Sequence, residues 1–268
     1  KKFALVENSQ QTGYGMPSFT LLGSRVIRFP FILHTSYPHE ILHNWFGNGV
    51  YIDPNSGNWA EGLTTYLSDH ILQEQKGKGD RYRFQELVKY LNYVNESNDF
   101  PLIKFKRRDS MASQAVGYGK ALMVFHMLRL EVGDTVFLQA LRNFYNKNLF
   151  HYTGFEELQA SFEHTSKRNL KKFFSQWITR KGAPQLQLSS STISKQKDQY
   201  LLRLEIRQIQ SSPAFELNLP MAVWLKGKKE PWFGNLNLVK KKQPFFLSFP
   251  SKPLKVTLDP YHEIFRRL

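Results

Sequence analysis

Two histidines and a glutamate between residues 38 and 47 have the spacing of a zinc hydrolase site. This segment reads Pro-His-Glu-Ile-Leu-His-Asn-Trp-Phe-Gly, with His39 and His43 four positions apart. On a helix, residues four apart share one face with Cβ atoms about 5–6 Å apart, so both imidazoles can bind one ion. Glu40 would then contact a metal-bound water without binding the metal. The pattern therefore predicts a helix, beginning at Pro38 and ending by Gly47, that carries two metal ligands and a base.

A third ligand is required, because catalytic zinc takes three protein ligands and keeps one position for water. Glu61 is the candidate, since it begins the next stretch with helical spacing of apolar residues. Asp69 and Thr65 are weaker candidates for a residue that orients a metal ligand by a hydrogen bond. The alternative is a helix with two ordinary structural histidines, and chance gives this motif roughly once in a hundred chains of this composition.

Four stretches make the chain resemble the aminopeptidase N (alanyl aminopeptidase) family of gluzincin metallopeptidases. Most of the likeness lies in His-Glu-Ile-Leu-His-Asn-Trp-Phe-Gly-Asn at 39–48 and Trp-Ala-Glu-Gly at 59–62. Ala-Leu-Val-Glu-Asn at 4–8 is similar to the family's Gly-x-Met-Glu-Asn motif, and Gly-Tyr-Gly-Lys-Ala at 117–121 to its catalytic tyrosine segment. The likeness runs in order to about residue 185 and is weaker beyond it.

This resemblance implies a zinc-dependent aminopeptidase that acts on peptides. The implied ligands of its one Zn²⁺ are His39, His43 and Glu61. Glu40 is implied as general base and acid, Tyr118 as the donor to the oxyanion, and Glu7 as the residue that binds the substrate's free α-amino group. Two departures from the family pattern are an alanine at position 4 in place of glycine, and 17 rather than 18 residues between His43 and Glu61. The second indicates a shortened loop at 53–57.

Other interpretations of these residues remain open. By spacing alone, Tyr118 is a boundary tyrosine with a solvated hydroxyl, and Glu7 belongs to a Glu-Asn turn. An endopeptidase or dipeptidase would share the zinc chemistry without capture of the amine. A non-catalytic binding module on the same scaffold is a third alternative. Arg107 and Arg108 lie in a polar stretch, where exposed loop arginines are the commoner outcome and binding of a substrate carboxylate is the other.

The charge of the chain is strongly basic, with 37 Lys and Arg against 22 Asp and Glu in 268 residues. Residues 186–268 hold fourteen of the basic and six of the acidic side chains. Such lysines usually form a solvated face, so we expect at most weak association with an anionic surface. The lysine clusters lack interleaved aromatic residues and any known nucleic-acid motif, so no nucleic acid partner is expected.

The sequence is compatible with more than one cellular compartment. No run approaches the roughly 18 apolar residues of a membrane span, and no signal peptide is recognisable. The absence of cysteine excludes disulfides and thiolate zinc sites, and fits the cytoplasm or the periplasm of a bacterial-type cell, membrane-associated or not. Because the chain opens within a family-like motif, we expect the natural N-terminus to lie upstream.

The elements that must position these residues follow from periodicity. Short strands are expected at 5–6, 19–22 and 26–27, with a turn at 13–15; helices at 61–76, 81–95, 115–145 with a break at 133–134, 154–165 and 168–181. After Pro184 the period changes to two, which predicts an antiparallel sandwich. We therefore expect an α+β chain: a mainly α-helical zincin catalytic domain with a small N-terminal β layer (1–185), then a β-sandwich (186–268).

Overall fold

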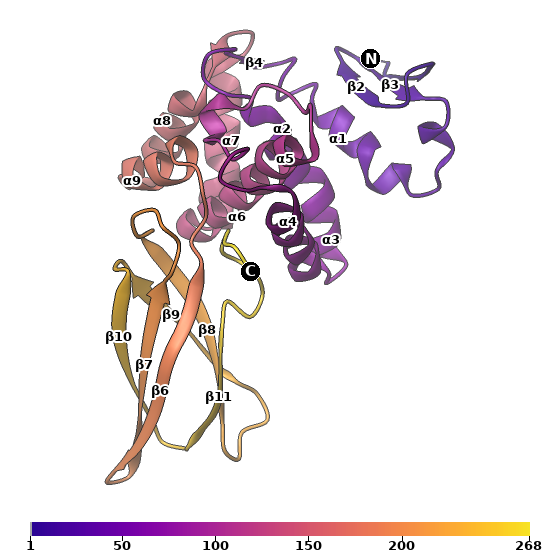
Figure 1. Cartoon of the computed structure of the whole chain (residues 1–268). Coiled ribbons are helices and arrows are strands. Elements are labelled where there is room, and N and C mark those ends of the chain that lie inside the picture. Colours follow the sequence, from indigo (N-terminus) through magenta and orange to yellow (C-terminus); the bar gives the residue numbers. More distant parts are fainter. Residues whose placement is uncertain (1) are drawn as a thin grey trace. The chain divides into compact units, whose positions relative to one another are not determined.

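The computed structural model describes residues 2–268, which form two compact units. The first ends at Lys181, and the second is Gly182–Leu268. Helices dominate the first unit behind a small N-terminal sheet, and the second consists of strands (Figure 1). This confirms the expected α+β architecture of small N-terminal strands, a helical region and C-terminal antiparallel sheets.

The N-terminal sheet differs from expectation in two places. Its strands are β1 (Ala4–Asn8), β2 (Gly13–Met16) and β3 (Phe19–Gly23), in the order β1-β3-β2, with β1 parallel and β2 antiparallel to β3. The predicted turn at 13–15 is therefore strand β2, and the predicted strand at 26–27 is a 3₁₀ turn, Val26–Arg28. Glycines commonly indicate a turn, which is why a turn was expected here. In the structure, Gly13 and Gly15 lie in an extended strand, where the absence of a side chain leaves room for a neighbouring helix.

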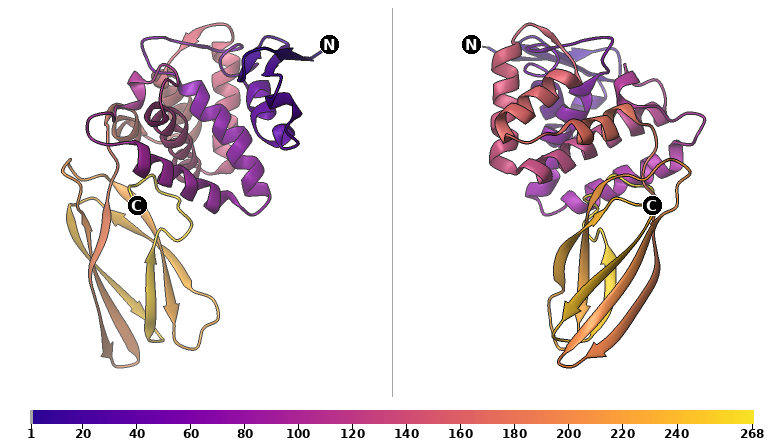
Figure 2. Two further views of the ribbon diagram at one scale, coloured as in Figure 1. Left: turned by 45° about the vertical axis from the view of Figure 1, so that its right-hand side comes forward. Right: turned by 90° about the vertical axis from the view of Figure 1, so that its left-hand side faces the viewer.

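The helical part is built mainly from α-helices (Figure 2), and π-helical turns extend or join some of them. The α-helices are α1 (Ser36–Leu42), α2 (Trp59–Thr65), α3 (Ile71–Gln75), α4 (Gly79–Tyr93), α5 (Met111–Gln114), α6 (Ala121–Val132), α7 (Asp134–Asn148), α8 (Phe155–Ser166) and α9 (Lys171–Phe174). The π-helical turns are η3 (Tyr66–His70), between α2 and α3; η5 (Ala115–Lys120), between α5 and α6; and η6 (Ser175–Thr179), after α9. Two short strands, β4 (Tyr51–Ile52) and β5 (Tyr152–Thr153), pair in parallel. The predicted helices are present, but periodicity did not reveal the π turns inside them.

Helix α6 is the centre of the helical core. Every residue from Ala121 to Leu128 is buried, and α2 packs against its beginning. A Cβ atom at Gly62 would collide with Ala121 Cβ, so glycine permits this close approach. Trp59 is fully buried, and its indole N–H donates to the carbonyl of Thr153 at 3.0 Å. Within residues 2–268 no helix combines the length and the apolar content needed to cross a membrane.

The second unit contains two three-stranded antiparallel sheets. Their strands are β6 (Leu186–Gln196), β7 (Gln199–Gln208), β8 (Leu217–Leu225), β9 (Trp232–Leu238), β10 (Lys242–Phe249) and β11 (Pro253–Leu258), ordered β10-β7-β6 and β11-β8-β9. Alternate residues of the central strands are buried, among them Leu204 on β7 and Leu219 on β8. Trp232 and Phe249 meet edge to face between the sheets, 5.2 Å apart at their centroids. The period of two thus buries one face of each sheet.

Two buried histidines lie in the helical core away from the motif histidines. His70 and His126 are 0% and 2% exposed, and their rings are 5.2 Å apart. Arg83 Nη1 donates to His70 Nε2 at 2.9 Å, so that nitrogen must be unprotonated. Burial lowers the pKa of His70 to about 3 and the pKa of His126 well below its usual value, and the charge of Arg83 adds to both effects. Both rings are therefore neutral in the folded protein at neutral pH.

We expect the free energy of unfolding to fall as the pH drops below about 6.5, because unfolded histidines take up protons that the buried rings exclude. His126 alone should contribute a loss of about 2 kcal/mol between pH 7 and pH 5. Urea unfolding of His126→Gln at both pH values should show a pH-dependent loss smaller by that amount. His164→Gln, which changes an exposed histidine, is the control and should behave like the parent chain. Equal losses in the parent and His126→Gln would contradict the assignment.

Candidate metal centre

Helix α1 and the turn after it carry the two motif histidines. The helix begins at Ser36, two residues before the predicted start at Pro38, and ends at Leu42, so His43 occupies its C-cap. His39 is buried, and His43 is half-buried. The turn continues to Gly47, whose φ of 122° is one that glycine adopts readily and other residues rarely do. It brings the Phe46 carbonyl to His43, where Nδ1–H donates at 2.9 Å.

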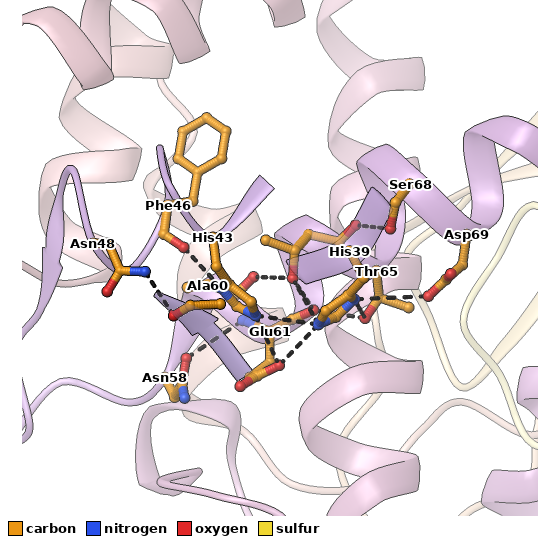
Figure 3. Close-up of polar contacts among 12 residues, drawn as sticks. His39, His43, Phe46, Asn48, Asn58, Ala60, Glu61, Thr65, Ser68 and Asp69 are labelled. Carbon is orange, nitrogen blue, oxygen red and sulfur yellow. Dashed lines mark hydrogen bonds and ion pairs between the residues drawn. The ribbon is translucent and has the colours of Figure 1, made fainter. Parts of the chain in front are cut away.

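Glu61 reaches both histidines from α2 (Figure 3). The side chain of Asn58 caps this helix by accepting the Glu61 N–H at 3.4 Å. Glu61 Oε2 lies 3.2 Å from His39 Nε2 and 3.5 Å from His43 Nε2, and the two Nε2 atoms are 3.2 Å apart. The structure thus brings the three predicted ligands together in spite of the shorter interval between them. The segment between His43 and Glu61 turns at 53–57, where Asp53 Oδ1 accepts the Asn55 N–H.

These three atoms fit a zinc ion. Ligand atoms at about 2.0–2.1 Å from a tetrahedral zinc lie about 3.3–3.4 Å from each other. The observed separations of 3.2, 3.2 and 3.5 Å form such a triangle. Since His43 uses its Nδ1 hydrogen for Phe46, its Nε2 presents a lone pair to the cluster. Two nitrogens and a carboxylate oxygen this close favour a positive charge among them, which a divalent ion would supply.

The far side of the His39 ring is also held. Its Nδ1 lies 3.7 Å from Asp69 Oδ2 and 3.5 Å from Thr65 Oγ1. Thr65 in turn donates to the Glu61 carbonyl at 2.7 Å. The π-helical turn η3 contains Asp69, and one wider turn changes the face that the following residues present. Both residues that the sequence suggested for this orienting position therefore lie beside the ring.

The electrostatics of the cluster point the same way. Burial alone would lower the pKa of His39, but the carboxylates of Asp69 and Glu61 outweigh it and raise the pKa to about 10. Burial disfavours the charged form of Glu61, yet His39 and His43 hold its pKa far below the usual range. The cluster therefore favours a positive charge beside the ionised Glu61. A bound metal ion would replace the proton of His39 in that role, because imidazole binds a metal through an unprotonated nitrogen.

Glu40 lies against strand β2. Its carboxyl group is buried, and Gly15 of that strand lies beside it. A Cβ atom at Gly13 would collide with Glu40 Oε1, and one at Gly15 would lie 2.5 Å from His43 Cβ. Burial raises the pKa of Glu40, while the charges of the histidines oppose the rise. These glycines were not predicted to belong to the site, although two glycines at alternate positions, 13 and 15, are a signal of close backbone approach.

Tyr118 lies beside the cluster, on η5. Its ring stacks 6.3 Å from the His39 ring and meets Phe105 edge to face at 5.8 Å. A Cβ atom at Gly117 would collide with the Phe105 ring, so the adjacent glycine allows this packing. Burial and the charge of Glu61 raise the pKa of Tyr118 well above its usual value. The hydroxyl therefore keeps its proton at neutral pH and can donate it in a hydrogen bond.

A cavity of about 560 Å³ joins these groups. Its lining includes His39, Glu40, His43, Glu61 and Tyr118. Strand β2 lines it from the sheet.

Glu7 is placed elsewhere. It lies on β1, at the far edge of the sheet from β2, and is not among the residues that line the cavity. Its side chain is 52% exposed and forms an ion pair with Arg28 at 3.3 Å. Of the six predicted site residues, the structure brings five together and leaves Glu7 apart, so its role in binding the amine stays a prediction.

Several known proteins are similar to this chain in sequence and in fold. Probable aminopeptidase 1 of Sulfurisphaera tokodaii is 22% identical over 82% of this chain and 28% of its own length, and aminopeptidase M1 of Arabidopsis thaliana is 26% identical over 56% and 18%. The crystal structure of Legionella pneumophila aminopeptidase A in complex with aspartic acid matches 98% of this chain and 31% of its own, with a TM-score of 0.71 at 19% identity. The chain spans less than a third of the length of each of these proteins.

The sequence model of the peptidase family M1 domain matches residues 35–177, more than half of the chain. The match covers both motif histidines, Glu61 and Tyr118. It confirms the resemblance seen in the sequence: the chain belongs to peptidase family M1.

Proposed function

We propose that this chain carries the catalytic site of a zinc-dependent aminopeptidase, which removes N-terminal residues from peptides. The observation that carries the proposal is the triangle of donor atoms, 3.2–3.5 Å apart, on a cavity that also holds a buried carboxyl and a tyrosine hydroxyl. Family membership supports it, as do relatives described as aminopeptidases from an archaeon and a plant.

The proposed site holds one zinc ion through His39, His43 and Glu61. When bound, zinc acts as a Lewis acid toward a carbonyl oxygen and lowers the pKa of a water to about 7. The protein keeps the ligands in place from behind, since the Phe46 carbonyl fixes the tautomer of His43 and Asp69 faces the other nitrogen of His39.

Glu40 acts as the base and then the acid of the reaction. It lies one residue after His39 and lines the same cavity, so its carboxylate can take a proton from the attacking water. The raised pKa of the buried carboxyl makes it a stronger base than an exposed glutamate. The same carboxyl then gives its proton to the departing amine.

Tyr118 donates its hydroxyl hydrogen to the oxygen of the carbonyl under attack. Charge develops on that oxygen only in the transition state, so the hydrogen bond stabilises the transition state more than the bound substrate and lowers the barrier. The raised pKa keeps the hydroxyl protonated across the range in which Glu40 works. The ring is fixed between His39 and Phe105, so the donor is oriented before substrate arrives.

Replacing the base and replacing a ligand should have separable effects. Glu40→Gln should keep zinc and lose about 10²–10⁴-fold in kcat on aminoacyl-amides, because acid–base transfer is removed. His43→Ala should lose the metal as well as the activity. Elemental analysis beside a hydrolysis assay measures both, with His34→Ala, at an exposed histidine, as the control that keeps zinc. Undiminished turnover by Glu40→Gln, or one zinc per chain in His43→Ala, would refute the corresponding role.

Tyr118→Phe removes a hydroxyl and leaves the packed ring. We expect kcat to fall by roughly 10²-fold with KM and zinc content nearly unchanged, since the lost hydrogen bond forms only in the transition state. Steady-state kinetics on one aminoacyl-amide give both parameters. A rise in KM with constant kcat would instead assign the hydroxyl to ground-state binding.

The role of Glu7 is open to a direct test. If Glu7 binds the amine, Glu7→Gln should lower kcat/KM on free-amine peptides selectively by about tenfold or more. If its side chain only pairs with Arg28, the change should stay below about threefold, which would refute the role. Assays on matched peptides with free and N-acetylated termini measure this loss and separate an aminopeptidase from an endopeptidase in the same experiment.

A further inference from the structure

The cavity contains one cation without a partner. Besides the histidines, its charged lining comprises the carboxylates of Glu40, Glu61, Asp69 and Glu86 and two cationic side chains, Lys89 and Arg108. Lys89 Nζ is 2.6 Å from Glu86 Oε1, so these two charges neutralise each other. Within residues 2–268, Arg108 makes no ion pair and no hydrogen bond. It is also exposed, so its guanidinium is free to meet a ligand that enters the cavity.

The loop that carries Arg108 is anchored at both ends. On one side the Phe105 carbonyl accepts the backbone N–H of Asn58 at 2.7 Å, the residue that caps the helix of Glu61. On the other side the backbone N–H of Asp109 donates to Ser113 Oγ at 2.9 Å, beside the capping box that Ser113 makes with Ser110. Only 106–108 lie between these anchors. The position of Arg108 is therefore tied to the helices of both Glu61 and Tyr118.

Arg108 also lies within electrostatic reach of the reacting groups. Burial and Glu61 raise the pKa of Tyr118, and the positive charge of Arg108 acts against them. Arg108 and Tyr118 also line the same cavity. Its neighbour Arg107 lies beside Asp109 and lines a separate hollow with Phe100 and Lys104. Two adjacent arginines therefore serve different surfaces.

We propose that Arg108 is a substrate-binding residue that recognises a carboxylate of the peptide. This inference rests on the proposed function and specifies its substrate class. A guanidinium presents paired N–H donors that match a carboxylate, and peptides offer that group in two places. One is the C-terminus of a short peptide, and the other is the side chain of an acidic residue near the cleaved bond. In either case the enzyme prefers an anionic group at this side of the cavity.

The experiment compares Arg108→Gln with Arg107→Gln in the zinc-loaded full-length protein. Two substrate pairs separate the sources of the carboxylate: Leu-Leu against Leu-Leu-amide for the C-terminus, and Glu-Leu-amide against Gln-Leu-amide for the side chain. For each pair, the preference is the ratio of kcat/KM on the carboxylate substrate to kcat/KM on the uncharged one. We expect Arg108→Gln to lower this ratio about tenfold for one of the two pairs, because KM for the carboxylate substrate rises. Activity on the uncharged amides should persist, and Arg108→Lys should restore part of the preference.

Arg107→Gln should leave kcat/KM on all four substrates as in the parent protein. Equal preferences in Arg108→Gln and the parent protein, or the same change in both arginine variants, would overturn the proposal. Titration calorimetry with the same pairs in the Glu40→Gln background gives the affinities without turnover. If the parent protein hydrolyses none of the substrates, the proposed function fails. The calorimetric preference for the carboxylate, and its loss in Arg108→Gln, then decides the role of Arg108 alone.

Discussion

The structure depends on holding three electron-rich atoms within 3.5 Å of each other. Two imidazole nitrogens and a carboxylate oxygen repel each other at this distance unless a positive charge lies among them. Helix α1 with its following turn, and helix α2, hold them against this repulsion. The folded chain thus contributes rigidity, and a cation contributes the attraction that makes the arrangement stable.

That rigidity comes from close backbone approach. Gly62 lets α2 pack on the start of α6, which puts Glu61 near Tyr118, and Gly15 lets strand β2 lie on α1 behind Glu40. Trp59 fixes the start of α2 through a buried hydrogen bond to Thr153. The site is therefore built where elements meet with almost no side chain between them. Larger residues at these positions would separate the groups by more than the chemistry tolerates.

Charge is distributed unevenly over the cavity. Carboxylates lie around the predicted metal ligands, and the ion pair between half-exposed Lys89 and buried Glu86 is neutral as a unit. Arg108 stands alone near the tyrosine, on a loop fixed to both neighbouring helices. In the proposed enzyme, such a site would distinguish the two sides of a substrate by sign as well as by shape. Specificity could then change by substitution in this loop while the metal ligands stay intact.

The sequence by itself determined the class of fold and predicted His39, His43 and Glu61 as metal ligands, Glu40 as the base and Tyr118 as a donor. Local rules account for part of this, since helical spacing puts His39 and His43 on one face and a change of period marks the strands, whereas the prediction for Tyr118 came from the family resemblance. Tertiary structure alone decided that Gly13 and Gly15 form a strand against Glu40, that a π turn holds Asp69 at His39, and that Glu7 lies apart from the cavity. These depend on contacts between distant segments, and neither periodicity nor a short motif encodes such distances.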